Sequence, residues 1–550
     1  MNHHHSETAR PIPRYTPHRL VILCQLALLA LFGLSAQAAT IIWSGASGTD
    51  TNWSTAGNWN GGVPTSADDV KFFDTGTNGV AGTPNNLVDG AFVGPIGSLQ
   101  FGNTNGFHTT VIAPGQTLTV NGGLSVFTPA DPGVAKTLNE TITGLEGTLT
   151  LNNTSSNLVL NQGNSAANGS RSILDLSGLG NFNANISRLG IGTTVLPNPS
   201  GNQRMAGTLS LARTNVITLN YTDTLANYQL AGRTNALEMV RHPGNNSGVM
   251  SFLYLGITNT VFVDSMGFGR DKASAGSAAW MGFNPAFTNL NPTVYIRGAS
   301  GGSSRVTWWS LGDMNASASS AQVSVGTNDF TGGTVDAMVD VLSLGRDCSP
   351  NHTATANIIG VLTFSAGTID ANTIYAGNQS LGPTTSLAPN IGILNVNGAA
   401  TLRVNSNLVL GRTVNASGTA ATRTSGTLNI RNGTVLAHSI SAGTTSTNNV
   451  ITLTNGTLVV TNTAGTIAKA ITTITTTNST LQLSVTGANS PNVVVTNLVT
   501  GGTTNIISVP TVAVFASYPT QFTLVKYTGS IGGAGYNFGL GAISGAAPGA

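Results

Sequence analysis

Charged residues recur beside glycines along the second half of the chain, and this repeated position is the first place where chemistry could occur. The residues concerned are Arg270-Asp271, Asp313, Arg346-Asp347 and Arg412. If Asp271, Asp313 and Asp347 were stacked on successive turns of a repeat, their carboxylates would form an acidic ladder able to bind calcium, which prefers oxygen ligands. The same residue types at a corner can instead hydrogen-bond the turn backbone and each other.

Two features of the sequence favour the structural interpretation of these residues. The series is interrupted farther along the chain, where the recurring position holds Asn378, Arg412 and Thr444. The sequence also lacks the calcium-binding repeat Gly-Gly-x-Gly-x-Asp. We therefore assign no metal-binding residue.

Three pairs of carboxylates are close enough in sequence to be considered for acid–base catalysis. They are Asp68 with Asp69, Asp336 with Asp340, and Asp264 with Asp271 near Arg270 and Lys272. Cleavage of a polysaccharide needs paired carboxylates, or a calcium-binding aspartate cluster with a Lys or Arg base. None of the pairs forms a recognised motif, and adjacent residues on a strand point to opposite faces. We interpret them as turn or surface charges and assign no catalytic residue.

The histidines and the cysteine show no spacing typical of a metal site. His108, His242, His352 and His438 are scattered, so we expect them to be polar surface residues. Cys348, expected in a loop, is the only cysteine after the N-terminal segment and cannot form an intramolecular disulfide. No phosphate loop, dinucleotide fingerprint or Gly-x-Ser-x-Gly elbow occurs in the required strand–helix context. The sequence predicts no cofactor.

Composition indicates a β-rich chain with many tight turns. Charged residues are 8% and hydrophobic residues 40% of the 550 positions, and 68 are glycine. Most of the remainder is Thr, Asn and Ser interleaved with Val, Leu and Ile. A net charge of +2 without clustered Lys and Arg argues against a nucleic-acid partner. The last acidic residue is Asp370, which excludes carboxylate-pair catalysis from residues 371–550.

A regular glycine spacing predicts the fold. Gly345, Gly377, Gly411 and Gly443 are separated by 32, 34 and 32 residues. Alternating apolar strands that begin at residues 362, 394, 428 and 451 follow the same steps, except that the last step is 23 because the segment after the glycine is shorter. A period in this range is typical of a solenoid. We expect an all-β parallel β-helix (β-solenoid) over residues 95–515, with coils of about 22 residues, surface loops inserted into most coils, and the most regular repeats at 311–465.

Residues 1–38 have the features of a secretory signal peptide. Arg10, Arg14 and Arg19 precede an apolar run at 20–34, and the sequence Ser-Ala-Gln-Ala at 35–38 offers a small-residue cleavage site. The apolar run is shorter than the roughly 20 residues that span a bilayer, which favours cleavage over membrane anchoring. We expect a protein that is secreted or exposed at the cell surface, without a transmembrane segment after cleavage.

Aromatic residues gather in two regions with different expected roles. Residues 39–94 contain Trp43, Trp53 and Trp59 and are interpreted as a cap that covers the first coil of the solenoid. A Trp-lined carbohydrate platform is the alternative interpretation of these rings. Residues 216–310 are less regular and rich in Tyr, Phe and Trp, so this region is where a functional patch, if the chain has one, is expected.

The capping segment also carries a family resemblance. Its sequence contains Trp43, Trp53 and the stretch Trp59-Asn60-Gly61-Gly62-Val63-Pro64, followed by Asp68-Asp69-Val70 and Phe72. This pattern resembles the opening of bacterial autotransporter-associated β-strand repeat proteins of the Verrucomicrobia type, and the short strands at 96–101 and 115–124 are similar to that family's Gly-x-Leu-x-Val units. The resemblance implies a secreted β-helical passenger-like scaffold. It implies no catalytic motif.

The Gly/Ala-rich segment 516–550 departs from the repeat and is interpreted as a truncated end of the solenoid. The chain is thus expected to be a secreted or surface-exposed structural and adhesive β-solenoid without catalytic activity. Extracellular polysaccharide or cell-surface components are the expected partners. The alternative is a carbohydrate-binding or polysaccharide-degrading β-helix protein, the latter a lyase or glycosidase.

Overall fold

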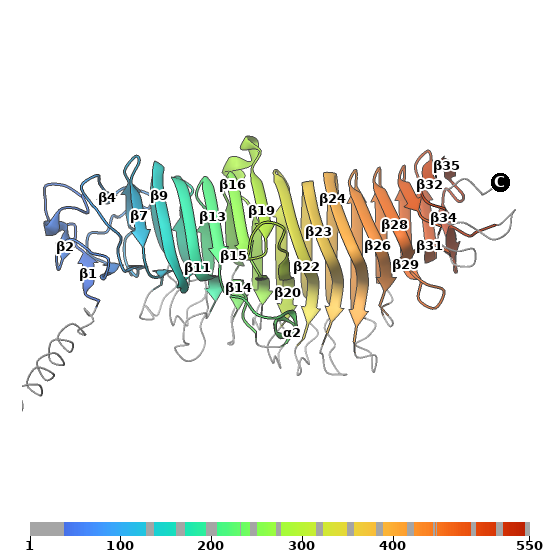
Figure 1. Ribbon diagram of the computed structural model, residues 1–550, viewed down its shortest axis with the longest axis horizontal. Coiled ribbons are helices and arrows are strands. Elements are labelled where there is room, and N and C mark those ends of the chain that lie inside the picture. Colours follow the sequence, from blue (N-terminus) through green and yellow to red (C-terminus); the bar gives the residue numbers. More distant parts are fainter. Residues whose placement is uncertain are drawn as a thin grey trace, which may run out of the picture.

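Parallel β-strands lie side by side along one long axis and form the rod seen in the computed structural model (Figure 1). The first strands lie at one end of the rod and the last strands at the other (Figure 1). The structure describes residues 38–127, 137–160, 171–193, 206–230, 233–241, 250–270, 277–314, 323–348, 357–380, 389–414, 423–443, 446, 448–485, 491–512 and 521–544.

In chain order, the strands up to residue 300 are β1 (Thr40–Trp43), β2 (Trp59–Asn60), β3 (Asp69–Phe72), β4 (Asn86–Val88), β5 (Ser98–Phe101), β6 (Thr109–Ile112), β7 (Thr117–Val120), β8 (Leu124–Val126), β9 (Thr137–Leu160), β10 (Arg171–Asp175), β11 (Leu179–Thr193), β12 (Gly207–Ser210), β13 (Thr214–Leu219), β14 (Leu237–Arg241), β15 (Met250–Leu255), β16 (Thr258–Val263), β17 (Ser265–Arg270), β18 (Ser277–Phe283) and β19 (Thr293–Arg297). The helical turns are η1 (Ala56–Asn58), α2 (Leu225–Tyr228) and η2 (Pro285–Leu290).

The later strands are β20 (Val306–Met314), β21 (Ser324–Phe330), β22 (Thr334–Asp347), β23 (Ile358–Gln379), β24 (Asn390–Thr413), β25 (Thr424–Arg431), β26 (Thr434–Ala442), β27 (Asn448–Thr454), β28 (Thr457–Ala464), β29 (Ile471–Thr477), β30 (Thr480–Leu483), β31 (Val493–Gly501), β32 (Asn505–Val509), β33 (Val525–Tyr527), β34 (Ile531–Gly533) and β35 (Phe538–Ile543).

Within the described residues these strands pair in three parallel stacks, numbered here in the order in which one coil passes through them. The coil of β23 places residues 358–364 in stack 1, 367–371 in stack 2 and 373–379 in stack 3. Stack 1 runs through β4, β6, β9, β10, β12, β15, β18, β21, β23, β24, β25, β27, β29, β31 and β34. Stacks 2 and 3 follow in each coil, and the segment that joins stack 3 to the next coil carries the predicted loops.

The observed register confirms the predicted β-solenoid and its repeat. Leu362 pairs with Leu394, Leu394 with Leu428, and Leu428 with Ile451. These steps of 32, 34 and 23 residues match the sequence, and Ile451 pairs with Ile474 after a further 23. The bare coil is thus 23 residues, close to the predicted 22. The loop segments at 349–356, 381–388 and 415–422 lie outside the described residues.

Alternation of side chains along each strand places one row inside the rod. In β23, Leu362 and Phe364 are fully buried, whereas Thr363 between them faces outward. The inward Leu, Ile, Val and Phe side chains of successive coils form one continuous core along the rod. Burial of each such side chain contributes roughly 1.5–3 kcal/mol to folding, so the apolar rows fix the register at every coil.

The recurring glycines stand near the end of stack 3, two residues before its last paired position. Gly345 has φ +62°, and a Cβ there would lie 2.2 Å from the backbone oxygen of Ile391, in the stack 1 strand of β24. Gly312 and Gly377 have positive φ and the same kind of contact, at 2.1 Å from Ile359 O and 2.3 Å from Ser425 O. A side chain at this corner would clash with backbone as well as strain φ, which explains why the period is marked by glycine.

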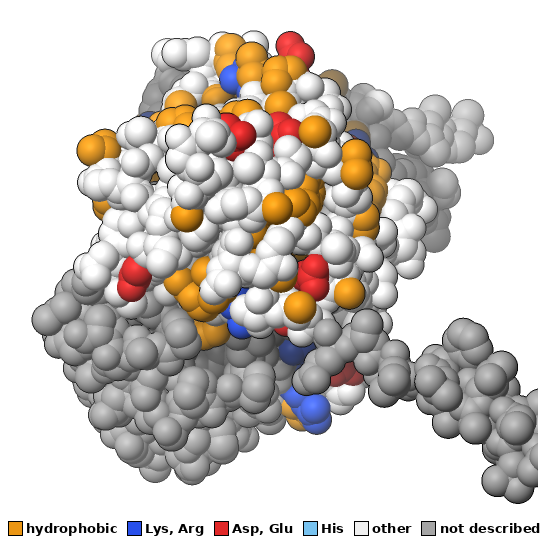
Figure 2. Space-filling model, turned by 90° about the vertical axis from the view of Figure 1, so that its left-hand side faces the viewer, with side chains coloured by type: hydrophobic (Ala, Val, Ile, Leu, Met, Phe, Trp, Pro, Cys, Tyr) orange, Lys and Arg blue, Asp and Glu red, His pale blue; other side chains and the backbone are white. Residues whose placement is uncertain are grey.

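The tryptophans of the predicted cap are buried at the N-terminal end of the core. Trp59 packs edge to face against Trp43, Trp53 and Phe72. Trp43 stacks on Phe72 and Trp53 lies tilted to it, and the ring centroids of these pairs are 4.8–5.9 Å apart. Strand β2 folds back antiparallel on β1, the first strand of stack 3. The end-on view shows mostly uncharged polar atoms over this end, with small separate hydrophobic and acidic patches (Figure 2). Because the rings are buried, the alternative of a Trp-lined sugar platform in this segment is wrong.

The aromatic region 216–310 continues the three stacks and carries additional chain outside them. Leu209 of β12 pairs with Leu253 of β15 after 44 residues, and residues 220–230 account for part of this longer step. Tyr228 of α2 packs on Trp308 and Val341 on the outside of stack 3, so that both rings are almost fully buried. At the other end, β33, β34 and β35 still pair with strands of the rod, so the stacks extend beyond residue 515.

The corner glycines lead to a first prediction. Gly345→Ala should destabilise the rod more than Gly302→Ala, because both glycines have φ near +60° but a Cβ at Gly302 meets no atom within 4 Å. The left-handed backbone alone costs about 1–2 kcal/mol for alanine, and the Cβ at residue 345 must in addition displace a backbone carbonyl. Thermal unfolding of the two variants, followed by circular dichroism, measures the difference. Equal losses would show that the corner relaxes and that only φ requires glycine.

Candidate functional site

Three aromatic side chains stand together on the outer face of stack 1. Strand β15 buries Ser251, Leu253 and Leu255 and turns Phe252 and Tyr254 outward, where both are partly exposed. Trp280 of β18 pairs with Phe252 in the neighbouring coil and is also partly exposed. The ring centroid of Tyr254 lies 5.6 Å from that of Phe252 and 5.3 Å from that of Trp280. We call Phe252, Tyr254 and Trp280 the aromatic platform.

A glycine makes room for the indole of Trp280. Gly282 pairs with Tyr254 on the same outer face, and a Cβ at Gly282 would lie 2.6 Å from the Trp280 ring and 2.3 Å from the backbone oxygen of Asp329. The indole therefore covers the strand beside Tyr254 and does not extend away from it. Rings held in this way present an apolar surface next to polar strand atoms, which suits the stacking of a sugar ring with hydroxyl groups at its rim.

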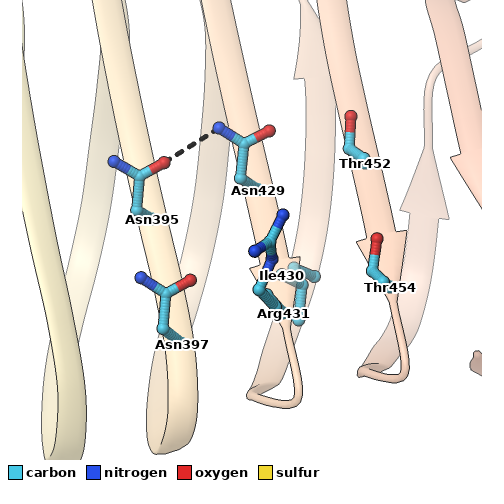
Figure 3. A pocket seen from close by; sticks show the side chains of 7 residues that line it. All are labelled: Asn395, Asn397, Asn429, Ile430, Arg431, Thr452 and Thr454. Atoms are coloured by element: carbon cyan, nitrogen blue, oxygen red, sulfur yellow. Dashed lines mark hydrogen bonds between the residues drawn. The ribbon is translucent and has the colours of Figure 1, made fainter.

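Farther along the same face the outward residues are amides and hydroxyls. Asn395 of β24 donates to Thr363 Oγ1 at 2.9 Å, and Asn429 of β25 donates to Asn395 Oδ1 at 2.8 Å (Figure 3). Thr452 continues this row, and Asn397, Arg431 and Thr454 form the row beside it. A shallow groove of about 360 Å³ lies between the rows. We call it the amide groove; its lining residues are Asn395, Asn397, Asn429, Ile430, Arg431, Thr452 and Thr454.

The structure does not bring the repeated aspartates together. Asp313 pairs with Arg270 in the coil before it and with Arg346 in the coil after it, whereas Asp347 pairs with Met314 and Gln379. The Asp313 carboxylate lies 3.5 Å from Arg270 Nε and 3.2 Å from Arg346 Nη1, and all three side chains are buried. The stacked acidic ladder for calcium is therefore wrong, and the interpretation of Arg and Asp binding each other at the corner is confirmed. Asp271 lies outside the described residues.

This row of Arg and Asp side chains continues in the coils on both sides. Arg270 also forms an ion pair with Glu238, and Arg412 donates to Asn378 Oδ1 at 3.2 Å. Residues on the outside of stack 3 cover it: Arg270 donates to the backbone oxygen of Arg233 at 2.6 Å, and Arg346 donates to that of Gln229. Breaking one partner of such a buried pair is strongly destabilising, so this charge cluster has a structural role.

Each carboxylate pair considered for catalysis has structural partners. Asp68 accepts from the backbone N–H and the hydroxyl of Thr65, while Asp69 accepts from Ser98 at 2.5 Å, so the two carboxylates have different neighbours. Asp336 forms an ion pair with Arg297 at 2.8 Å, and Asp340 accepts from Asn372. Asp264 accepts from the backbone N–H of Ala299, and its proposed partners Asp271 and Lys272 lie outside the described residues.

Two of the predicted surface or loop residues are buried instead. Cys348 follows β22, is fully buried and has a pKa raised to about 12 by burial, so it is a poor nucleophile. His108 is also fully buried, which corrects the expected surface position, whereas His438 is exposed. His242 and His352 lie outside the described residues. Among the described residues, no group of three or more His, Cys, Asp or Glu side chains is placed to hold a metal ion.

His108 belongs to a buried polar network between the first coils. Its Nε2 contacts the backbone oxygen of Phe73 at 2.6 Å, its Nδ1 contacts Asn85, and its backbone N–H donates to Glu140 Oε2 at 3.0 Å. Burial lowers the pKa of His108 to about 4, against the raising effects of the Phe73 oxygen and the Asp74 charge. Sequence reasoning missed this site because its members are far apart in the chain.

Glu140 is the most unusual member of this network. The side chain is fully buried, and burial raises its pKa to about 8 although the His108 N–H and the Asn103 side chain favour the charged form. Glu140 Oε1 and Asn103 Oδ1 are both buried acceptors without a hydrogen-bond partner among the described residues. Burial of Glu140 without a donor to Oε1 disfavours the charged form, which agrees with the raised pKa, so Glu140 is a neutral carboxylic acid at pH 7.

This pair predicts a defined pH dependence of stability. Between about pH 4.5 and 6.5 the folded chain retains the Glu140 proton and lacks the His108 proton, whereas the unfolded chain has the reverse, so the two effects cancel. Between about pH 6.5 and 8 the folded chain holds one extra proton, and its stability should fall as pH rises, by about 2 kcal/mol in all. Just below about pH 4.5 both states hold the Glu140 proton, but only the unfolded chain holds the His108 proton. The stability of the folded chain should therefore fall as pH falls there.

Glu140→Gln should remove the decline between about pH 6.5 and 8, because an amide does not titrate. Chemical denaturation across this range, with hydrogen exchange of the β6 amides, measures the effect. Glu146→Gln is the matched control, because Glu146 is exposed on the same strand, and this variant should retain the decline. A decline of unchanged size in Glu140→Gln would contradict the assignment.

The comparisons with known proteins identify no relative, so the function is inferred from this geometry. No helix within the described residues is long and apolar enough to cross a membrane, and the predicted signal peptide at residues 1–38 lies almost entirely outside them. No protein-family model, curated protein or solved structure matches this chain.

Proposed function

We propose that this chain is a structural rod, secreted or exposed at the cell surface, that adheres to extracellular polysaccharide without catalysing its cleavage. The aromatic platform is the observation that carries the proposal. Its three rings stand on adjacent coils, partly exposed, on an outer face whose other residues are mainly Thr, Asn, Ile and Val. A row of rings beside hydroxyl and amide groups matches the alternation of apolar faces and polar rims along a sugar chain.

The architecture supports the structural part of the proposal. Every coil hydrogen-bonds to the next through parallel strands, and one continuous apolar core runs through the coils. Such a rod holds outward groups at the strand spacing of about 4.8 Å per coil, so several ligand units can be bound at once. The binding energy of each contact can then be small, because contacts along one ligand chain add through effective concentration.

The charges on the outer faces support binding without catalysis. The carboxylates of the regular region that face outward are held by cations or amides, as in Arg297–Asp336 and Arg305–Asp370, at 2.8 and 2.7 Å. A hydrolase needs one carboxylic acid and one carboxylate on the two sides of a glycosidic bond. The resemblance of the segment at residues 43–72 to autotransporter-associated repeat proteins supports export and a scaffold role.

Trp280→Ala should weaken binding to a neutral β-linked glucan by about 3- to 10-fold, since each aromatic contact contributes roughly 0.5–1.5 kcal/mol. Affinity electrophoresis and calorimetry with the full chain measure this. Tyr295→Ala is the matched control: Tyr295 is a partly exposed ring on stack 2, away from the platform, and its loss should leave the affinity unchanged.

The same incubations test the absence of catalysis. Polysaccharide retained by the rod should show no new reducing ends and no unsaturated ends. Release of either product would overturn the non-catalytic part of the proposal. Equal affinities of the unmodified chain, Trp280→Ala and Tyr295→Ala for all polysaccharides would overturn the adhesive part.

A further inference from the structure

The amide groove contains one charged side chain, and the rest of the protein does not neutralise it. Arg431 is exposed at the end of β25, and within the described residues no hydrogen bond or ion pair engages its guanidinium group. Its side chain extends along the strand toward the Asn429 amide and stands between Asn397 and Thr454 (Figure 3). Arg270, Arg297, Arg305 and Arg346 differ in this respect, because all four bind carboxylates.

The charge distribution of the chain isolates this guanidinium further. Residues 39–370 contain 13 Lys and Arg and 19 Asp and Glu, a net charge of −6, whereas residues 371–550 contain six Lys and Arg and no acidic residue, a net charge of +6. On the coils of β24, β25 and β27, which line the groove, every ionised side chain is thus a cation, and Asp370 in the adjacent coil of β23 is bound by Arg305. An anion that approaches this part of the rod is attracted over a range of about a Debye length, roughly 8–10 Å at physiological salt.

The lining of the groove limits the class of ligand. The side-chain amides of Asn395, Asn397 and Asn429 offer donors and acceptors, and Thr452 and Thr454 offer hydroxyls. The groove spans only three adjacent strands, β24, β25 and β27. Such groups suit a ligand with many hydroxyls, and the guanidinium suits a planar carboxylate or a sulfate. A nucleic acid would require several clustered cations, which this groove lacks.

From these observations we infer that the amide groove is a subsite for an acidic saccharide unit, with Arg431 binding its carboxylate or sulfate group. This inference rests on the proposed function and names a ligand class for the same face. The platform and the groove both lie on stack 1, separated by the coils of β21 and β23, so a single extended chain can reach both. In such a chain the platform binds sugar faces and the groove selects charge.

Calorimetry with the full chain and three oligosaccharide probes tests the inference. The probes are hexagalacturonate, its fully methyl-esterified and therefore neutral form, and a sulfated galactan hexamer. The unmodified chain should bind at least one acidic probe about tenfold more tightly than the neutral ester, and this preference should weaken at high salt. Preference for hexagalacturonate would identify a carboxylate subsite, and preference for the sulfated hexamer would identify a sulfate subsite.

Arg431→Ala should abolish the preference, and Arg431→Lys should keep part of it, because a lysine retains the charge but not the two-pronged geometry. Arg403→Ala is the matched control, since Arg403 is also exposed on β24 but lies on stack 2, beside Asp370 of the preceding coil and away from the groove. Circular dichroism and thermal unfolding check that each variant is folded, and Arg431→Gln replaces Arg431→Ala if the latter unfolds. Equal affinity for hexagalacturonate, the sulfated hexamer and the ester, or equal losses in Arg431→Ala and Arg403→Ala, would overturn the inference.

The failure of the proposed function can be distinguished from the failure of this inference. If Trp280→Ala binds the neutral glucan as well as the unmodified chain does, the platform is not the adhesive site, yet an Arg431-dependent preference for an acidic probe still supports the subsite. If Arg431→Ala keeps the full preference while Trp280→Ala loses glucan binding, the adhesive proposal stands and the subsite is refuted.

Discussion

The close approach of backbones at the glycine corner near the end of stack 3 is the constraint on which the rest of this rod depends. At Gly312, Gly345 and Gly377, the space for a side chain is already occupied by a carbonyl of a later coil. A second glycine series, with Gly360 and Gly392 among its members, meets the first from stack 1, and a Cβ at Gly392 would lie 2.3 Å from the Gly377 nitrogen. Without this contact the coils could not hold the strand-pairing distance, and the inward rows would lose their alignment.

Because side chains alternate along the strands, inward and outward positions are under different constraints. Inward positions vary little in character, because each must fill the same core layer as its neighbours above and below. Outward positions on the same strands are free to change from coil to coil, and stack 1 uses this freedom: aromatic rings at β15 and β18 give way to amides and hydroxyls at β24, β25 and β27. A regular scaffold can therefore present an irregular recognition surface.

The sequence predicts the parts of this structure that depend on local pattern. The pairing of Leu362, Leu394, Leu428 and Ile451 follows from apolar alternation and glycine spacing, and the structure reproduces it. The separation of Asp347 from Asp313 also follows from the sequence, since Asp313 directly follows its glycine whereas Asp347 is the second residue after Gly345, and neighbours on a strand face opposite ways. By contrast, the platform and the Glu140 network join residues across irregular steps, such as Phe252 with Trp280 and His108 with Glu140, which no local pattern specifies.

The chain that covers the buried arginines also sets an order of assembly. Most contacts in the rod join one coil to the next, so a chain that emerges N-terminus first could fold coil by coil. The bond between Arg346 and Gln229 spans 117 residues, and Tyr228 packs on Trp308 and Val341. Residues 220–230 therefore cannot make these contacts until the coils of β20 and β22 have folded. The middle of the rod should therefore fold as one cooperative unit, because residues 220–230 pack only against coils that are formed later in the chain.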